Sequence, residues 1–310
     1  MTIILGAGST SNSVAPVAGF EFAATISAST NNYDIRVAAL AGGWDGVEAL
    51  FATITINAAV IVGSTSSSTP ALQTNAVATS FPGGSTLAII NNGTILGKGG
   101  DGGDGGQATA TGSSHSAGNG TNGTAGGDGL YARYAVSINN NSIVGGGGGG
   151  GAGGGGCAFH TGSTGNAMSG NGAGGGQGQT GGALGVVGSV TDTVTDLWTY
   201  NGTSVNGTAG TATGKGLGEN LARNVLNFEL TSSSFKSSWI QKARGGGGGN
   251  GGIWGATGSV SAFTPNDSDP LYTWTTASNG SAGAAGYYSV GDSAYVTWST
   301  TGTRHGSASG

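Results

Sequence analysis

The chain has 310 residues, of which 69 are glycine and 7% are charged, and its net charge is −5. Ordinary domains carry about 25% charged residues, and a weak negative charge excludes the basic footprint of a nucleic-acid-binding protein. One cysteine excludes an intrachain disulfide framework. No apolar run approaches the ~18 residues of a membrane span, and the start lacks the features of a secretory signal. We therefore expect a soluble protein made in the cytoplasm.

Residues 1–96 are predicted to form a small β-rich domain. Residues 20–27 alternate apolar with polar or small side chains, and residues 52–62 are rich in β-branched side chains, as strands are. Between them, residues 37–51 are predicted to hold a short helix interrupted by a glycine-rich turn. Trp44 lies in that turn and is predicted to be a core residue.

Residues 97–310 differ sharply in composition, since only ten glycines precede residue 97. In the first glycine tract, Lys98, Asp101 and Asp104 fall at every third position with glycine between them. A period of three fits neither an α-helix nor a strand, but it fits the polyproline-II conformation. This first tract covers residues 97–106, and similar tracts follow at 120–129, 145–156, 172–181, 207–216, 245–252 and 280–286.

Two interpretations of these tracts compete: flexible linkers, and a bundle of polyglycine-II helices whose backbones bond to one another. In polyproline-II geometry no backbone group bonds within its own chain, so each must find a partner elsewhere. The sequence disfavours collagen because none of the five prolines lies in a tract. Linkers rarely keep period three, so we favour the bundle. The predicted fold is mostly β and irregular: a β-rich domain followed by a polyglycine-II bundle with aromatic-bearing loops.

An internal repeat supports this organisation. Residues 90–97 match residues 138–145 at a spacing of 48, and each copy is predicted to be strand, turn, strand leading into a glycine tract. If consecutive tracts are antiparallel, one bundle end holds the connections 107–117, 157–169, 219–243 and 287–310. The end beside residues 1–96 then holds 130–144, 184–206 and 253–278.

Candidate chemical sites are weak. Cys157 and His160 resemble half of a metal site and lack a second pair of ligands. Residues 210–216 lack the spacing and the final Ser or Thr of a phosphate loop. Asp267 and Asp269 lack the glycine and glutamate of a calcium loop. We therefore predict no catalytic residue, no metal, no cofactor and no enzymatic activity; a depolymerase would need paired carboxylates, and few acidic residues lie outside the tracts.

The aromatic residues beyond residue 97 are concentrated in the connections between tracts. Tyr and Trp among Ser, Gly and Asn are typical of adaptable binding loops, although such rings also cap the ends of a bundle. A rigid scaffold that carries such loops is typical of a binding protein. Our first-choice binding residues come from the end remote from residues 1–96: Phe159, His160, Phe228, Phe235, Trp239, Tyr287 and Tyr288. The second set comes from the other end: Trp198, Tyr200, Phe263, Tyr272 and Trp274.

Alternating glycine tracts and aromatic segments after a β-rich domain resemble the tail-fibre tip adhesins of T-even-like bacteriophages. The resemblance covers roughly residues 97–286. It implies a polyglycine-II bundle, attachment to a tail-fibre protein through the N-terminal domain, and loops that bind an outer-membrane protein or surface glycan of a bacterium. It therefore implies a virion protein at the fibre tip that determines host range, with no nucleic-acid partner and no membrane insertion.

The alternative is a structural virion, tail or surface-layer protein that recognises no receptor. The two hypotheses differ in what loop substitutions would change: adsorption to the host for the adhesin, and particle assembly for the structural protein. Monomeric and trimeric states are both compatible with the sequence.

Overall fold

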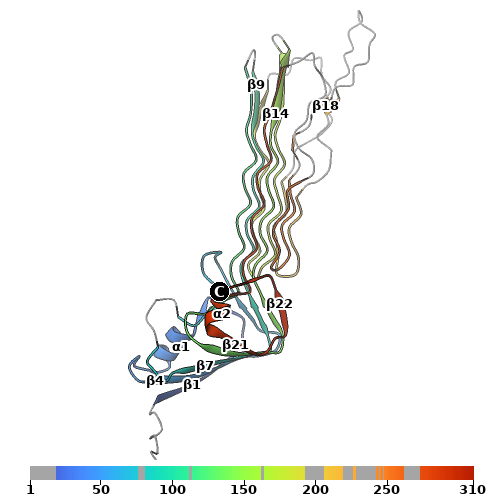
Figure 1. Cartoon of the computed structure of the whole chain (residues 1–310). Coiled ribbons are helices and arrows are strands. Elements are labelled where there is room, and N and C mark those ends of the chain that lie inside the picture. Colours follow the sequence, from blue (N-terminus) through green and yellow to red (C-terminus); the bar gives the residue numbers. More distant parts are fainter. Residues whose placement is uncertain are drawn as a thin grey trace, which may run out of the picture.

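The computed structural model describes residues 19–75, 81–111, 114–161, 164–192, 206–218, 226–227, 242–243, 245–246, 248–261 and 273–310. The molecule has two parts (Figure 1). A compact part made of short strands, which we call the base, lies at one end. Long extended segments rise from the base side by side and carry short strands at their far end.

The base is a three-sided parallel β-solenoid, formed by three five-stranded sheets. Each coil of the solenoid contributes one strand to each sheet. The first sheet contains β1 (Gly19–Ile26), β4 (Ala49–Ile56), β7 (Thr86–Asn91), β12 (Val136–Asn140) and β21 (Val296–Thr300). The second contains β2 (Thr30–Asn31), β5 (Ile61–Gly63), β8 (Thr94–Leu96), β13 (Ile143–Gly145) and β22 (Thr303–His305). The third contains β3 (Tyr33–Asp34), β6 (Leu72–Gln73), β11 (Leu130–Tyr131), β20 (Ser289–Val290) and β23 (Ala308–Ser309).

Two short helices connect strands of the base. Helix α1 (Ile35–Ala41) begins after Asp34, whose side chain accepts a hydrogen bond from the Val37 N–H. It ends at the predicted glycine turn, where Gly43 has a φ of 102°. Helix α2 (Asp292–Tyr295) joins β20 to β21. Trp44 is 2% exposed, which confirms it as a core residue.

The core of the base consists of apolar side chains stacked in register from coil to coil. Ile54 lies opposite Ile89, Ile89 opposite Ile138, and Ile138 opposite Trp298. All three isoleucines are almost fully buried. Burying each of them stabilises the fold by about 1.5–3 kcal/mol, and the parallel register holds the coils at one spacing.

A buried asparagine ladder marks one corner of the solenoid. The Asn91 side chain donates hydrogen bonds to Asn140 Oδ1 at 2.8 Å and to the Ile143 carbonyl at 3.0 Å. These two asparagines belong to the internal repeat, and the strands pair at a spacing of 49 residues, not the 48 read from the sequence. The spacing of 49 places Ile89 opposite Ile138 and Asn91 opposite Asn140. The predicted order of strand, turn and strand before a glycine tract is confirmed in both copies, and the turn is a corner between two sheets.

The extended segments, which we call rods, run alternately away from the base and back towards it. In chain order they are rod 1 (97–107), rod 2 (118–129), rod 3 (146–156), rod 4 (169–178), rod 5 (181–189), rod 6 (206–211), rod 7 (214–218), rod 8 (245–246 and 248–252), rod 9 (256–261) and rod 10 (277–286). Rods 1 and 3 are parallel, as the repeat predicted, since Gly100 donates to Gly148 and Gly103 to Gly151.

Rod 3 lies at the centre of the bundle, and its hydrogen bonds change partner at each residue. The N–H groups of Gly150, Gly151 and Ala152 donate to rods 2, 4 and 9, and the N–H of Gly153 returns to rod 2. Carbonyls of rod 3 accept from rods 1, 8 and 10. This period of three uses backbone groups on all sides of the rod, which an ordinary strand cannot do.

Side chains complete the hydrogen bonds where a rod lies at the surface. On rod 2, Asn119, Asn122 and Asp128 accept hydrogen bonds from backbone N–H groups of residues 278, 281 and 287, at 2.7–2.9 Å. We call these interactions rungs. On rod 1, Asp101 and Asp104 accept from Ala183 and Val186 in the same way. The period-three acidic residues of the first tract therefore satisfy donors of a neighbouring rod.

The fold corrects two expectations about organisation. The C-terminal strands β20 to β23 join the base sheets, as do β11 to β13, so the base does not end at residue 96. The tract spacing also missed rods 5, 7 and 9, which fold back after turns near residues 179, 212 and 254. Because these returns were missed, residues 190–192, 273–276 and 289–290 lie at the end opposite to the one assigned to their connections. Residues 226–227 and 242–243 of the connection 219–243 lie at the far end, as assigned (Figure 1).

The far end of the rods carries short strands. They are β9 (Ala108–Thr111), β10 (Ser114–Ala117), β14 (Cys157–Thr161), β15 (Thr164–Met168), β16 (Val190–Asp192), β17 (Leu226–Asn227), β18 (Lys242–Ala243) and β19 (Thr273–Thr276).

Candidate functional site

Two small sheets end the bundle at the pole opposite the base, and we call them the tip sheets. In one, β9 pairs antiparallel with β10 and parallel with β16. In the other, β14 pairs antiparallel with both β15 and β19. Each strand continues directly from a rod, so the direction of the rods sets the direction of the strands. Figure 1 shows β9 and β14 at the top of the bundle.

The tip sheets pack against each other through small side chains. Ala108, Ala110, Ala158 and Ala167 form one cluster, and each is at most 1% exposed. β9 contacts β15 and β10 contacts β14 across this cluster. Alanine lets two sheets approach closely without side-chain entropy being lost. The tip is therefore a packed extension of the rods.

The structure brings together two predicted residues that the sequence had placed at opposite ends. In the β14–β19 pairing, Phe159 lies opposite Trp274 and His160 lies opposite Thr273. Phe159 and His160 belong to the first-choice set, and Trp274 to the second. The missed rods explain the error, because they return residues 273–276 to the tip. Within the described part of the chain, β14 and β19 are therefore the tip strands that carry predicted binding residues.

Tyr287 and Tyr288 lie at the base, so their assignment to the remote end is wrong. They directly precede β20, which pairs with β11 and β23 in the base. The Tyr288 ring centroid is 6.1 Å from that of Trp298, and the Arg304 guanidinium lies 5.1 Å from the Tyr288 ring. Tyr288 also packs against the base core. This residue stabilises the last two coils.

The other predicted residues lie outside the described part of the chain. They are Phe228, Phe235 and Trp239 of the first set, and Trp198, Tyr200, Phe263 and Tyr272 of the second. Their roles stay predictions.

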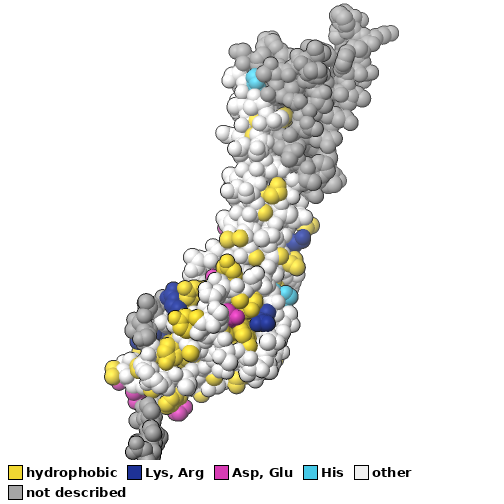
Figure 2. Space-filling view, viewed as in Figure 1, with side chains coloured by type: hydrophobic (Ala, Val, Ile, Leu, Met, Phe, Trp, Pro, Cys, Tyr) yellow, Lys and Arg dark blue, Asp and Glu magenta, His cyan; other side chains and the backbone are white. Residues whose placement is uncertain are grey.

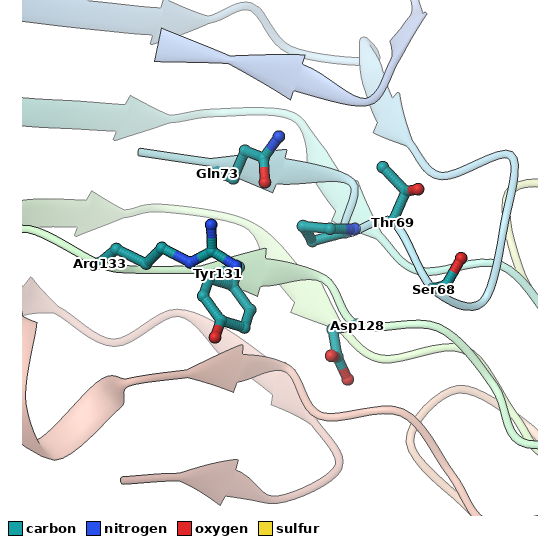
Figure 3. Close-up of a pocket in the computed structure, with 7 residues that line it drawn as sticks. Ser68, Thr69, Gln73, Asp128, Tyr131 and Arg133 are labelled. Carbon is teal, nitrogen blue, oxygen red and sulfur yellow. The ribbon is translucent and has the colours of Figure 1, made fainter. Parts of the chain in front are cut away.

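A pocket lies where rod 2 enters the base, and we call it the base pocket (Figure 3). Its volume is about 260 Å³, and Ser68, Thr69, Pro70, Gln73, Asp128, Tyr131 and Arg133 line it. These residues come from the loop before β6, from β6, from the end of rod 2 and from β11 with the residues after it. The Arg133 guanidinium lies 4.5 Å from the centre of the Tyr131 ring, a cation–π contact.

The carboxyl group of Asp128 is partly withdrawn from water in this pocket. Burial raises its pKa, and the hydrogen bond that its Oδ1 accepts from the Tyr287 N–H at 2.8 Å opposes the rise. Sequence reasoning missed this site. The available signal was the rarity of charge, since Asp128 and Arg133 stand five residues apart in a chain with 7% charged residues.

Metal and membrane features give no further site in the described part of the chain. Those residues include no group of three or more His, Cys, Asp or Glu side chains placed to hold a metal ion. Among them, too, no helix is both long enough and apolar enough to cross a bilayer. Cys157 is buried at the start of β14.

Comparison with known proteins gives one family match. A model of the family described as "Phage tail fibre adhesin Gp38" matches residues 21–309. Among solved structures, the chain is similar to the gp37–gp38 adhesin tip complex of the bacteriophage S16 long tail fiber. The identity is 21%, the match covers 93% of this chain and 82% of that chain, and the TM-score is 0.45. No curated protein matches significantly.

Proposed function

Since this chain belongs to the family of phage tail fibre adhesins Gp38, we propose that it is the receptor-binding protein at the tip of a tail fibre. Membership of the family implies a location on the tail of the virion. In our proposal the tip sheets and the segments joined to them bind an outer-membrane protein or a surface glycan of the host bacterium. Binding there determines which hosts the phage infects.

The observation that carries this proposal is the cross-bonding of the rods. We propose that the rods are polyglycine-II helices. Support comes from hydrogen bonds of rod 3 that repeat every three residues and reach a different rod at each step. A bundle bonded on all sides resists bending, so it holds the tip in a fixed position relative to the base. Pre-organised binding residues lose less conformational entropy when they bind.

Adsorption of phage to host cells tests receptor binding. Purified protein should occupy the receptors and block adsorption, and alanine substitutions of Phe159 and Trp274 should weaken the block. The matched control is Tyr295→Ala, which removes an exposed aromatic ring from the base. If a saturating concentration of the protein does not reduce adsorption, the proposal is contradicted. Equal loss with tip and base variants contradicts the assignment of binding to the tip.

We also propose that the base attaches the protein to a tail-fibre protein. Charged and apolar side chains gather on the base in Figure 2, whereas most of the visible rod surface is neither. The first coils expose Val37, Leu40 and Val47, the last of which is 78% exposed. Val47→Asp should release the protein from purified fibres. Val186→Asp, at an exposed valine on rod 5, is the matched control and should leave attachment intact.

In this proposal the protein is not an enzyme. Recognition by a rigid tip needs shape and aromatic contact, whereas glycoside hydrolysis needs paired carboxylates at a fixed separation. Incubation with host surface polysaccharide should therefore leave its length unchanged. Chromatography that shows shortened chains would contradict this part of the proposal.

A further inference from the structure

The base pocket has the composition of a site for a small polar ligand. Its lining includes one acidic side chain, Asp128, and one basic side chain, Arg133. Ser68 and Thr69 add hydroxyl groups, and Gln73 adds an amide. Pro70 and the ring of Tyr131 supply apolar surface. Neutral polyhydroxylated rings need this combination, since they offer both donors and acceptors on their edges and C–H groups on their faces.

The structural role of Asp128 does not require a charged side chain. Its rung to the Tyr287 N–H needs one acceptor oxygen, and on the same rod Asn119 and Asn122 supply that oxygen as amides. On rod 1, Asp104 makes a rung as a carboxylate, but it is exposed to water, where a charge costs little. At Asp128 the carboxylate loses hydration, which raises its pKa. An amide there would satisfy the rung without that cost.

The walls of the base pocket are held in place from outside it. The backbone N–H of Arg133 donates to Thr74 Oγ1 at 3.0 Å, and the guanidinium of Arg133 stacks on the Tyr131 ring. Gln73 donates to Asp34 Oδ2 at 3.2 Å. Figure 3 shows Tyr131 between the side chains of Arg133 and Asp128 in this view. The polar groups are thus positioned before a ligand arrives.

We propose that the base pocket binds one neutral sugar ring. Its volume of about 260 Å³ lies below the ~300–1,000 Å³ of pockets for drug-sized ligands, which limits it to a single ring. The second oxygen of the Asp128 carboxylate accepts from sugar hydroxyls, Arg133 donates to them, and Pro70 and Tyr131 contact the ring. This site lies at the opposite end of the rods from the tip, so the inference goes beyond the proposed function.

Saturation-transfer NMR with the full chain tests the proposal. The probes are the methyl glycosides of glucose, galactose, mannose and N-acetylglucosamine, at millimolar concentration because single sugars bind weakly. At least one glycoside should receive saturation from the protein. Arg133→Gln and Asp128→Asn should each weaken that binding at least about tenfold, since each removes a charge-assisted hydrogen bond.

Matched variants separate binding from folding. Arg304 also stacks on a tyrosine but lies outside the base pocket, so Arg304→Gln should leave the signal unchanged. Asp104→Asn changes a carboxylate to an amide at another rung and should also leave it unchanged. Thermal melting should show that both base-pocket variants fold. The proposal is wrong if no glycoside receives saturation, or if the base-pocket variants bind as well as their controls.

Discussion

Replacing Gly150 with alanine should disrupt the centre of the bundle. An added Cβ at this position would lie 2.5 Å from the carbonyl carbon of Asp101 in rod 1, and nearer still to its oxygen. Both atoms belong to backbone, so no side chain can rotate away to make room. Rods 1 and 3 must therefore separate if the substitution is to be accommodated.

The magnitude follows from the hydrogen bonds around this contact. Separation breaks the bonds of Gly100 and Gly103 to rod 3 and strains those that Gly150 makes with Thr124 and Gly283. Each bond contributes about 0.5–1.5 kcal/mol, so their loss lowers the free energy of unfolding by roughly 2–6 kcal/mol. The melting temperature should fall by roughly 3–9 °C for a chain of this size.

Thermal melting followed by circular dichroism measures this effect, with Gly83→Ala as the control. Gly83 has open space where a Cβ would be added, so its substitution should leave the melting temperature almost unchanged. Gly150→Ala melting at the same temperature as Gly83→Ala would refute the close-packing argument. Ala152 shows that rod 3 accommodates one Cβ, and Ala152→Gly should therefore have a much smaller effect than Gly150→Ala.

The remaining predictions concern rungs, the asparagine ladder and pH. Ala125→Asn should stabilise the protein by about 0.5–1.5 kcal/mol in urea unfolding, because it supplies the missing rung to Ala284 on the pattern of its neighbours; an unchanged midpoint would contradict this. Asn91→Ala should cost about 2–4 kcal/mol by the same measurement, since it removes the hydrogen bonds of Asn91 to Asn140 Oδ1, the Ile143 carbonyl and the Gly93 N–H in a buried corner; a cost below that of Asn92→Ala, at a partly exposed neighbour, would contradict it. Burial raises the folded-state pKa of Asp128, so the stability it contributes is fully present below the ordinary value of 3.8 and is lost as pH rises through the folded-state pKa. Asp128→Asn should therefore melt slightly above wild type at pH 7, and the difference should vanish below pH 3.8.

The sequence revealed the rods wherever glycine kept its period of three. Rods 1, 2 and 3 follow directly from such tracts, because only glycine lets the backbones approach so closely. Rod 9 reads Ala-Thr-Gly-Ser-Val-Ser and carries one glycine. Its outer side faces solvent, so side chains are tolerated there and the periodic signal disappears.

The base was predicted less completely because its coils are far apart in sequence. Strand β12 pairs with β21 across more than 150 residues, and neither strand has a sequence feature that predicts which strand it pairs with. Strands such as β20 and β23 have two residues each, too few to show alternation. Phe159 and Trp274 were predicted as aromatic binding residues of two connections, but their pairing could be predicted only by counting every reversal of the chain.

The solenoid is interrupted twice, and each interruption begins at one strand of a coil and ends at the next strand of that same coil. Rods 1 and 2 separate β8 from β11, and rods 3 to 10 separate β13 from β20. The last coil is thus made only after the chain has left the base and come back. If synthesis stops early or one reversal of the rods misfolds, β12 and β13 lack their neighbours β21 and β22. Completion of the solenoid therefore requires that rods 1 to 10 have all folded back to the base.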